Sequence, residues 1–416
     1  MSRLGRSPLV VAGALLLFVA VASLGGSGCS GSGSSSNTTP TPPTTPNSNV
    51  QSISVTTGPA LSAGTISVNA AFTSVTVCVP GSTTQCQTID GVLVDTGSSG
   101  FRVLASALTL SLPQQKDGSG NPIAECAQFA GGQTWGPVQT ADISIAGEKA
   151  SSAVIQVIGS PAFPTVPQSC SSLGPMEDDL ASLVANGILG IGNFVQDCGT
   201  GCTESGAANL GFYYTCPSSG CQVTTQSLTN QVSNPVAMFA TDNNGVLIEL
   251  PAVSAPGATL AGSLIFGIGT QSNNALGSAT VYTVDPVLGN FTTTFNGQSY
   301  TDASFLDSGS NAIYFLDSAT TGIPTCTDLT FLYCPSSTQN LSATNIGANG
   351  AMGTVNFSVE NGDTLTANQS NSVLPNLGGP NTGSFDWGLP FFYGRNVFTA
   401  IEGKSTPGGT GPYVAY

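Results

Sequence analysis

The segment GVLVDTGSSGFRVL, residues 91–104, places Asp95 directly behind an apolar run. Small hydroxylated residues and glycine follow the aspartate, and a second apolar run comes after them. A tight turn capped by a lone aspartate is one explanation of this pattern. The other is that the apolar strand carries a carboxyl group into a buried site, where it forms half of a catalytic pair.

The motif occurs a second time. The segment ASFLDSGSN, residues 303–311, repeats the order of apolar residues, aspartate, hydroxylated residue, glycine and serine around Asp307. Each copy is followed later in the chain by an apolar segment with glycines, NGILGIGNF at 186–194 and WGLPFFYGRNVF at 387–398. Corresponding parts in two halves indicate a duplicated unit. Two copies favour a functional pair over a single capped turn.

Paired aspartates without histidine predict a particular acid–base chemistry. If the halves face each other, Asp95 and Asp307 lie too close to ionise together, so they share a proton. One carboxylate then accepts a proton from water while the other donates to a carbonyl group. Glycine permits the tight turn, and hydroxyl groups can hydrogen-bond the carboxylates. The predicted supporting residues are Thr96, Gly97, Ser98, Ser308, Gly309 and Ser310.

Composition excludes several other functions. The chain has 416 residues, no histidine, a charged fraction of 7% and a formal net charge of −15. The absence of histidine excludes serine or cysteine catalysis that uses a histidine base. An acidic surface repels phosphate, so we expect no nucleic-acid partner. No cofactor or metal site is predicted, because neither histidine nor a Cys-x-x-Cys pair is present.

The N-terminal part predicts export. Residues 1–28 combine arginines, an apolar run and small residues, as signal peptides do. The sequence LGGSGCSGS resembles the cleavage site of bacterial lipoproteins and predicts lipid attachment at Cys29. Ordinary cleavage with a free or paired Cys29 is the alternative, and a spanning helix is disfavoured because the run is short. Residues 29–50 are rich in Ser, Thr and Pro and predict a disordered linker.

Ten cysteines follow Cys29, which in an exported chain predicts up to five disulfides. Close spacing favours four local pairs and leaves one longer pair, although spacing alone does not determine connectivity. The expected pairs are Cys78–Cys86, Cys198–Cys202, Cys216–Cys221, Cys326–Cys334 and Cys126–Cys170.

From residue 50 onward, alternating apolar and polar residues predict a mostly β fold with barrel-like or sandwich sheets. We expect a hairpin around Gly147 and few helices, the candidates being Met176–Ala185 and Ala319–Gly322. The duplicated motif predicts an N-terminal lobe at 51–262 and a C-terminal lobe at 263–416.

These segments resemble the pepsin-like aspartic peptidases from about Val50 to the end of the chain. VLVDTGSSGFRVLAS and SFLDSGSNAIYFL are similar to the two active-site segments, and NGILGIGNF and WGLPFFYGRNVFTAIEG to the segments that support them. The resemblance implies a bilobal double-β-barrel fold with a substrate cleft between the lobes. It also implies that Asp95 and Asp307 form the catalytic dyad.

The sequence departs from that family in three places. Phe129 stands where the flap tyrosine is usual; Trp135 either supplies an indole donor instead or packs within the hairpin, which we favour. Pro390 and Phe391 replace a glycine and an aspartate. Arg102 stands where an apolar residue or tryptophan is usual, and it is either a solvated surface residue or one that approaches the cleft.

We therefore expect an aspartic endopeptidase-like hydrolase that cleaves extended peptides with water activated by Asp95 and Asp307. The alternative is a non-catalytic pepsin-like lipoprotein that binds peptides or another envelope component, because fold alone does not establish activity. The expected partners are a peptide or protein substrate and a membrane, through the anchor at Cys29. The expected location is the bacterial cell envelope, lipid-anchored, or secreted, and the expected state is a monomer.

Overall fold

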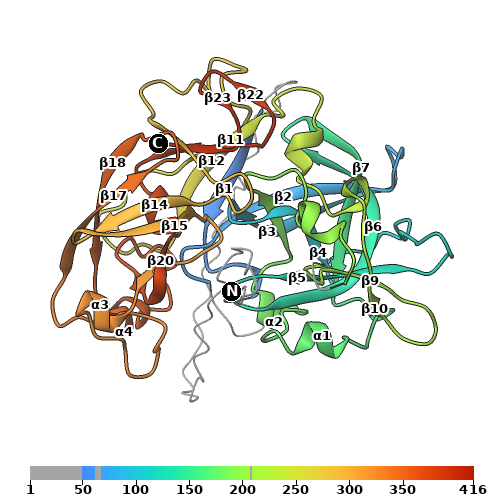
Figure 1. The fold of residues 1–416 in the computed structure, drawn as a ribbon, viewed down its shortest axis with the longest axis horizontal. Coiled ribbons are helices and arrows are strands. Elements are labelled where there is room, and N and C mark those ends of the chain that lie inside the picture. The colour runs from blue at the N-terminus through green and yellow to red at the C-terminus, as the bar shows by residue number, and fades with distance from the viewer. Residues whose placement is uncertain (1–48, 61–66, 207–208) are drawn as a thin grey trace, which may run out of the picture.

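The computed structural model describes residues 49–60, 67–206 and 209–416. Within them, strands dominate and form two lobes that lie side by side in Figure 1, the blue-to-green part on the right and the orange-to-red part on the left. The prediction of a mostly β, bilobal fold is confirmed. The predicted signal peptide, Cys29 and nearly all of the predicted linker lie outside the described residues, and the first strand begins at Val50, the last residue assigned to that linker.

The larger sheet runs through the first lobe and into the region between the lobes. Strand β6 pairs with β7 and also with β2, which closes part of this sheet into a barrel. In spatial order its described strands are β10 (Gln222–Val223), β9 (Tyr213–Thr215), β5 (Ile123–Gln128), β6 (Gln133–Ile145), β7 (Glu148–Ile158), β4 (Ser99–Leu104), β8 (Gly187–Ile191), β3 (Cys86–Asp95), β2 (Ala71–Cys78), β1 (Val50–Val55), β12 (Leu260–Phe266), β11 (Gly245–Glu249), β21 (Asn396–Ala400), β24 (Tyr413–Ala415) and β13 (Val281–Thr283).

The smaller sheet forms the second lobe. Its described strands, in spatial order, are β18 (Met352–Val359), β17 (Gln339–Ile346), β14 (Phe291–Phe295), β15 (Gln298–Leu306), β20 (Asn381–Trp387), β16 (Ile313–Leu316) and β19 (Gly378–Gly379). A short hairpin, β22 (Ser405–Thr406) and β23 (Gly409–Thr410), lies apart from both sheets. Within the described residues the α-helices are single turns: α1 (Gln168–Ser171), α2 (Leu180–Leu183), α3 (Ser318–Thr321) and α4 (Gly362–Thr366).

The same three-strand arrangement occurs once in each lobe. In the first lobe β8 lies between β3, to which it is parallel, and β4, to which it is antiparallel. In the second lobe β20 lies in the same way between β15 and β16. Strands with neighbours on both sides that are buried on both faces carry continuous apolar runs. This explains why GVLV and SFL immediately precede the two aspartates.

The expected boundary between residues 262 and 263 falls inside β12. This strand pairs with β1 on one side and with β11 on the other. Strands from both ends of the chain therefore meet in the sheet between the lobes. The division into lobes at 51–262 and 263–416 stays a prediction.

The predicted helix at Met176–Ala185 is shortened to α2. The backbone of Glu177 instead pairs with β6, because its N–H donates to the Gln133 carbonyl at 2.8 Å. Asp179 then caps the helix through the Ser182 N–H, and Val184 ends it in the left-handed region with φ 57°. Pairing with a neighbouring strand thus outweighed helix propensity. The helix expected at Ala319–Gly322 and the hairpin around Gly147 are present, as α3 and as β6 with β7.

All five expected disulfides are present. Four of them close short loops, and Cys126–Cys170 closes a loop with a sequence separation of 44. Disulfides persist in oxidising compartments, so this chain belongs to an extracellular or periplasmic environment. In the described part of the chain, no helix has both the length and the apolar composition that crossing a membrane requires.

Candidate active site

The two repeated units bring Asp95 and Asp307 together. Asp95 is the last residue of β3, and Asp307 directly follows β15. Parallel pairing with β8 and β20 fixes the direction in which each strand ends. The two carboxyl groups are close enough to influence each other's pKa, and a Cβ atom placed on Gly97 would lie 2.5 Å from the Asp307 carboxyl carbon. Only glycine at position 97 leaves room for this approach.

Reciprocal hydrogen bonds join the two aspartate loops. The Thr96 N–H donates to the Ser308 hydroxyl oxygen at 3.1 Å, and the Ser308 N–H donates to the Thr96 hydroxyl oxygen at 2.9 Å. Each hydroxyl group also donates across the interface, Thr96 to the Leu306 carbonyl at 3.2 Å and Ser308 to the Val94 carbonyl at 2.8 Å. This symmetric network holds the two loops in register, so Thr96 and Ser308 lie where a supporting role requires them.

Within each loop the glycine and the serine that follow the aspartate hold its carboxyl group. The Gly97 N–H donates to Asp95 at 2.8 Å, and the Ser98 hydroxyl group also donates to Asp95. Gly309 donates its N–H to Asp307 at 2.8 Å, and the Ser310 hydroxyl group lies 2.8 Å from a second Asp307 oxygen. The structure therefore brings together all eight residues that the sequence predicts for this site.

Both aspartates are completely buried, with exposed fractions of 0%. Burial raises the pKa of Asp95 above its usual value, because a charged carboxylate loses its solvation. Burial raises the pKa of Asp307 further, and the nearby negative charges of Asp95 and Asp386 add to the shift. A pair of this kind retains a shared proton over a wider pH range than two separate carboxyl groups.

A third carboxyl group, Asp386, adjoins the pair. It lies in β20 with an exposed fraction of 2%, and one of its oxygens lies 2.6 Å from the Ser310 hydroxyl oxygen. Burial raises the pKa of Asp386 well above its usual value, and the charge of Asp95 raises it further. The site thus contains three buried carboxyl groups.

A cleft of about 480 Å³ lies beside the dyad. Residues from both repeats line it, including Thr96, Gly97 and Ser98 from the first loop and Leu306 from the strand before the second. Apolar walls are provided by Phe129, Phe194, Leu210, Phe212, Val287, Leu288 and Phe305. The carboxyl groups of the dyad lie behind this surface and do not line the cleft.

The hairpin of β5 and β6 covers the cleft where a flap was expected. Phe129 lines the cleft and donates its N–H to the Gly132 carbonyl at 2.8 Å, which forms the tip. Trp135 is buried, donates its indole N–H to the Phe163 carbonyl at 3.1 Å and packs edge-on against Tyr214. Of the two roles considered for Trp135, the structure therefore shows hairpin packing.

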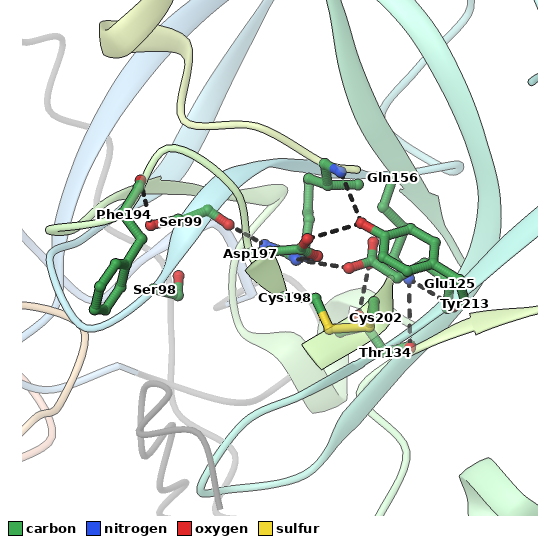
Figure 2. A network of polar contacts seen from close by, with 12 residues as sticks. Ser98, Ser99, Glu125, Thr134, Gln156, Phe194, Asp197, Cys198, Cys202 and Tyr213 are labelled. Atoms are coloured by element: carbon green, nitrogen blue, oxygen red, sulfur yellow. Dashed lines mark hydrogen bonds and ion pairs between the residues drawn. A yellow bond between two sulfur atoms is a disulfide. The ribbon is translucent and has the colours of Figure 1, made fainter. Parts of the chain in front are cut away.

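Arg102 belongs to a buried ionic network behind the flap. Its guanidinium group donates to Glu125 at 2.7 Å and to Asp197 at 2.8 Å, and its own side chain is 2% exposed. Figure 2 shows Glu125, Asp197 and Tyr213 gathered at this point, with Tyr213 donating to Asp197 at 2.7 Å. The solvated alternative for Arg102 is wrong, because these buried carboxylates neutralise it. Arg102 instead reaches the cleft, 5.5 Å from the centre of the Phe129 ring.

The family model described as "Protein of unknown function (DUF3443)" matches residues 45–416. The chain belongs to this family. No curated protein matches it. Among solved structures, the aspartic proteinase from Irpex lacteus is similar in fold, with a TM-score of 0.51 and 13% sequence identity. The match covers 88% of this chain and 96% of the fungal chain. It shows that this DUF3443 protein has a pepsin-like fold.

Sequence reasoning missed Asp386, Glu125 and Asp197 in this DUF3443 protein. Asp386 had a usable signal, because in SFDWGLPFF it stands within an apolar run, as Asp95 and Asp307 do. Glu125 and Asp197 had no such signal. They are recognisable only once Arg102 is known to be buried, since a buried cation requires partners.

Proposed function

We propose that this protein is an aspartic endopeptidase that hydrolyses extended peptides with water activated by Asp95 and Asp307. The observation that carries the proposal is the reciprocal hydrogen bonding of Thr96 and Ser308. This network aligns two buried carboxyl groups in equivalent loops, as a shared-proton mechanism requires. Two buried carboxylates this close would repel each other, and the shared proton that relieves this repulsion is the one that the proposed chemistry uses.

In the proposed reaction, Asp307 begins protonated and Asp95 begins ionised. This order follows the stronger upward shift of the pKa of Asp307. A water molecule passes one proton to Asp95 while its oxygen attacks the scissile carbonyl carbon, and Asp307 donates its proton to the carbonyl oxygen. Asp95 then protonates the departing nitrogen. The C–N bond breaks as one hydroxyl of the tetrahedral diol returns a proton to Asp307, which restores both groups.

The proposal requires the dyad to become accessible when a peptide binds. Both carboxyl groups are buried, and the adjoining cleft extends beneath the flap hairpin. Outward movement of that hairpin, with Phe129 at its edge, would join the cleft to the dyad. Flap movement of this kind commonly accompanies substrate binding in enzymes.

The location and partners are part of the same proposal. We place the protein in the bacterial cell envelope, held by a lipid at Cys29, or secreted, and acting as a monomer on peptide or protein substrates. The oxidising environment indicated by the disulfides supports this placement. Mass spectrometry of the mature N-terminus tests the anchor: a lipid-modified Cys29 supports it, and an unmodified terminus overturns it.

A second function is favoured by one observation, the complete burial of both carboxyl groups. A closed dyad beside an open apolar cleft also suits a non-catalytic protein that binds peptides or another envelope component. In that case the carboxyl groups serve only to join the lobes.

Cleavage of a peptide library between about pH 3 and pH 8 separates the two functions. The test compares the wild type with Asp95→Asn and Asp307→Asn. The matched control is Asp242→Asn, which changes a buried carboxyl group (4% exposed) that accepts hydrogen bonds from the side chains of Thr270 and Gln271. We expect the wild type and the control to cleave, a statine-type transition-state mimic to inhibit, and both dyad variants to lose activity. Peptide binding without cleavage in the wild type would establish the second function.

A further inference from the structure

One hydroxyl group stands between two carboxyl groups. The Ser310 hydroxyl oxygen lies 2.8 Å from an Asp307 oxygen and 2.6 Å from an Asp386 oxygen. Both distances are within the range of O–H···O hydrogen bonds. All three side chains are buried, so solvent does not separate them.

The number of hydrogen atoms needed for these two contacts shows that one of the two carboxyl groups is protonated. A serine hydroxyl group has one hydrogen and can donate to only one of its two neighbours. The other contact then requires a carboxylic acid that donates to the serine oxygen. Either Asp386 or Asp307 therefore carries a proton on the oxygen that faces Ser310.

The surroundings favour Asp386 as the protonated group. One oxygen of Asp307 accepts the N–H groups of Gly309 at 2.8 Å and Ser310 at 3.3 Å, and the proton that Asp307 holds in the proposed reaction is the one it shares with Asp95, distinct from the proton that faces Ser310. The second oxygen of Asp386 is buried and has no hydrogen-bond partner among the described residues. An isolated buried oxygen is far less costly in a neutral acid than in a carboxylate.

Among the described residues no cation forms an ion pair with this group of acids, although the charge of Arg102 acts on Asp95 from a greater distance. The groups that face Asp386 are Asp307 and Ser310 beyond β15, Tyr314 on β16 and Asp95 at the end of β3. Each of them is acidic or neutral. The ion pairs found in the described part of the chain involve other carboxylates. Retaining protons is therefore the way in which these three buried acids limit their net charge.

We infer that Asp386 is a positioning residue of the active site, which holds a proton and exchanges it with Asp307 through the Ser310 hydroxyl group. The effect of Asp386 on catalysis rests on the proposed function. The presence of the proton follows from the hydrogen-bond geometry alone.

The exchange conserves every proton. When Asp307 is ionised, as it is after it has donated its proton to the substrate in the proposed reaction, Asp386 donates its proton to the Ser310 oxygen while Ser310 passes its own hydrogen to Asp307. Serine stays neutral, and one proton moves from Asp386 to Asp307. As the pH rises, Asp386 can lose its proton first. The negative charge that then forms on Asp386 opposes loss of the proton that Asp95 and Asp307 share. Asp386 thus keeps the dyad singly protonated to higher pH than it would remain alone.

The direct test is a carbon-13 titration of aspartate carboxyl groups in the full disulfide-bonded chain. It compares the wild type, Asp386→Asn, Ser310→Ala and Ser310→Thr, with Asp242→Asn as the control. We expect Asp386 to keep its proton to a higher pH than an exposed aspartate does, because it is buried. In the wild type and in Ser310→Thr, which retains the hydroxyl group, the Asp307 and Asp386 signals should respond to each other's titration. Ser310→Ala should abolish this coupling.

Asp386→Asn should lower the titration midpoint of the dyad by about one to two pH units, because it removes a charge a few ångströms away. The high-pH limit of kcat/KM should move down equally in that variant and stay unchanged in Asp242→Asn. An Asp386 that titrates as an exposed aspartate, or a dyad midpoint unmoved by Asp386→Asn, overturns the inference. Coupled titration without cleavage by any variant overturns the peptidase proposal and leaves the proton link established.

Discussion

Glu177 offers a prediction of pH-dependent stability that does not depend on catalysis. Its side chain lies against Gly132 at the tip of the flap hairpin, is 2% exposed and has one oxygen without a hydrogen-bond partner among the described residues. Burial raises the pKa of Glu177 from 4.5 to about 8, and the charge of Asp178 contributes. The folded protein therefore holds this proton more tightly than the unfolded chain does.

The difference in pKa between the folded and unfolded states gives both the sign and the size of the change in the free energy of unfolding. Between about pH 4.5 and pH 8 the folded state keeps the proton and the unfolded state has lost it, so the free energy of unfolding falls as pH rises. Each pH unit corresponds to about 1.36 kcal/mol, which gives a loss of roughly 5 kcal/mol across the window. Glu177→Gln keeps the shape of the side chain and removes the titration.

Urea denaturation of the oxidised protein at a series of pH values measures the effect. Below about pH 4.5 the two proteins should keep a constant difference in stability, and above it the variant should gain up to roughly 5 kcal/mol relative to the wild type. Glu204→Gln, at an exposed glutamate, is the control and should parallel the wild type. Parallel curves for wild type and Glu177→Gln would refute the reasoning, because they would show that Glu177 ionises without cost in the folded protein.

Three further predictions concern stability. Thr96→Ala leaves the Ser308 N–H without its acceptor and should lower the free energy of unfolding, measured by urea denaturation, by about 1–3 kcal/mol. Thr96→Ser keeps the hydroxyl group and should cost much less. Equal losses in the two variants would contradict the hydrogen-bond argument. Replacing Cys126 and Cys170 together by serine should cost about 4 kcal/mol, from the length of the loop that they close; an unchanged melting temperature contradicts it. Arg102→Met leaves the buried acids Glu125 and Asp197 without their cation and should cost about 3–5 kcal/mol near pH 7. That loss should shrink in acid, because burial raises the pKa of Asp197 and its protonation removes a buried charge, and a loss that does not change with pH excludes the electrostatic cause.

The resemblance between the two halves could be recognised from the sequence because the residues that define it are close together in the chain. The residues that touch each carboxyl group follow it by two or three positions, so the motif and the site coincide. The disulfides were predictable for a related reason. Four of them join cysteines at most eight residues apart, and the fifth pair was what remained.

Contacts between segments that are distant in the chain could not be predicted from the sequence. The expected helix at Met176–Ala185 lost most of its length because Glu177 found a backbone partner on β6. Arg102 looked equally suited to the surface until Glu125 and Asp197 were found beside it. In each case the deciding partner lies 23 or more residues away, and no short-range pattern encodes such a pairing.

The sequence by itself determined that two aspartate loops exist, which residues hold each carboxyl group and that no histidine takes part. Only the tertiary structure decided that the loops meet through Thr96 and Ser308, that both carboxyl groups are buried, and that Asp386 joins them. The physical reason is that hydrogen bonds within a loop follow from adjacent residues. Burial and the coupling of charges depend instead on which strands become neighbours when the whole chain folds.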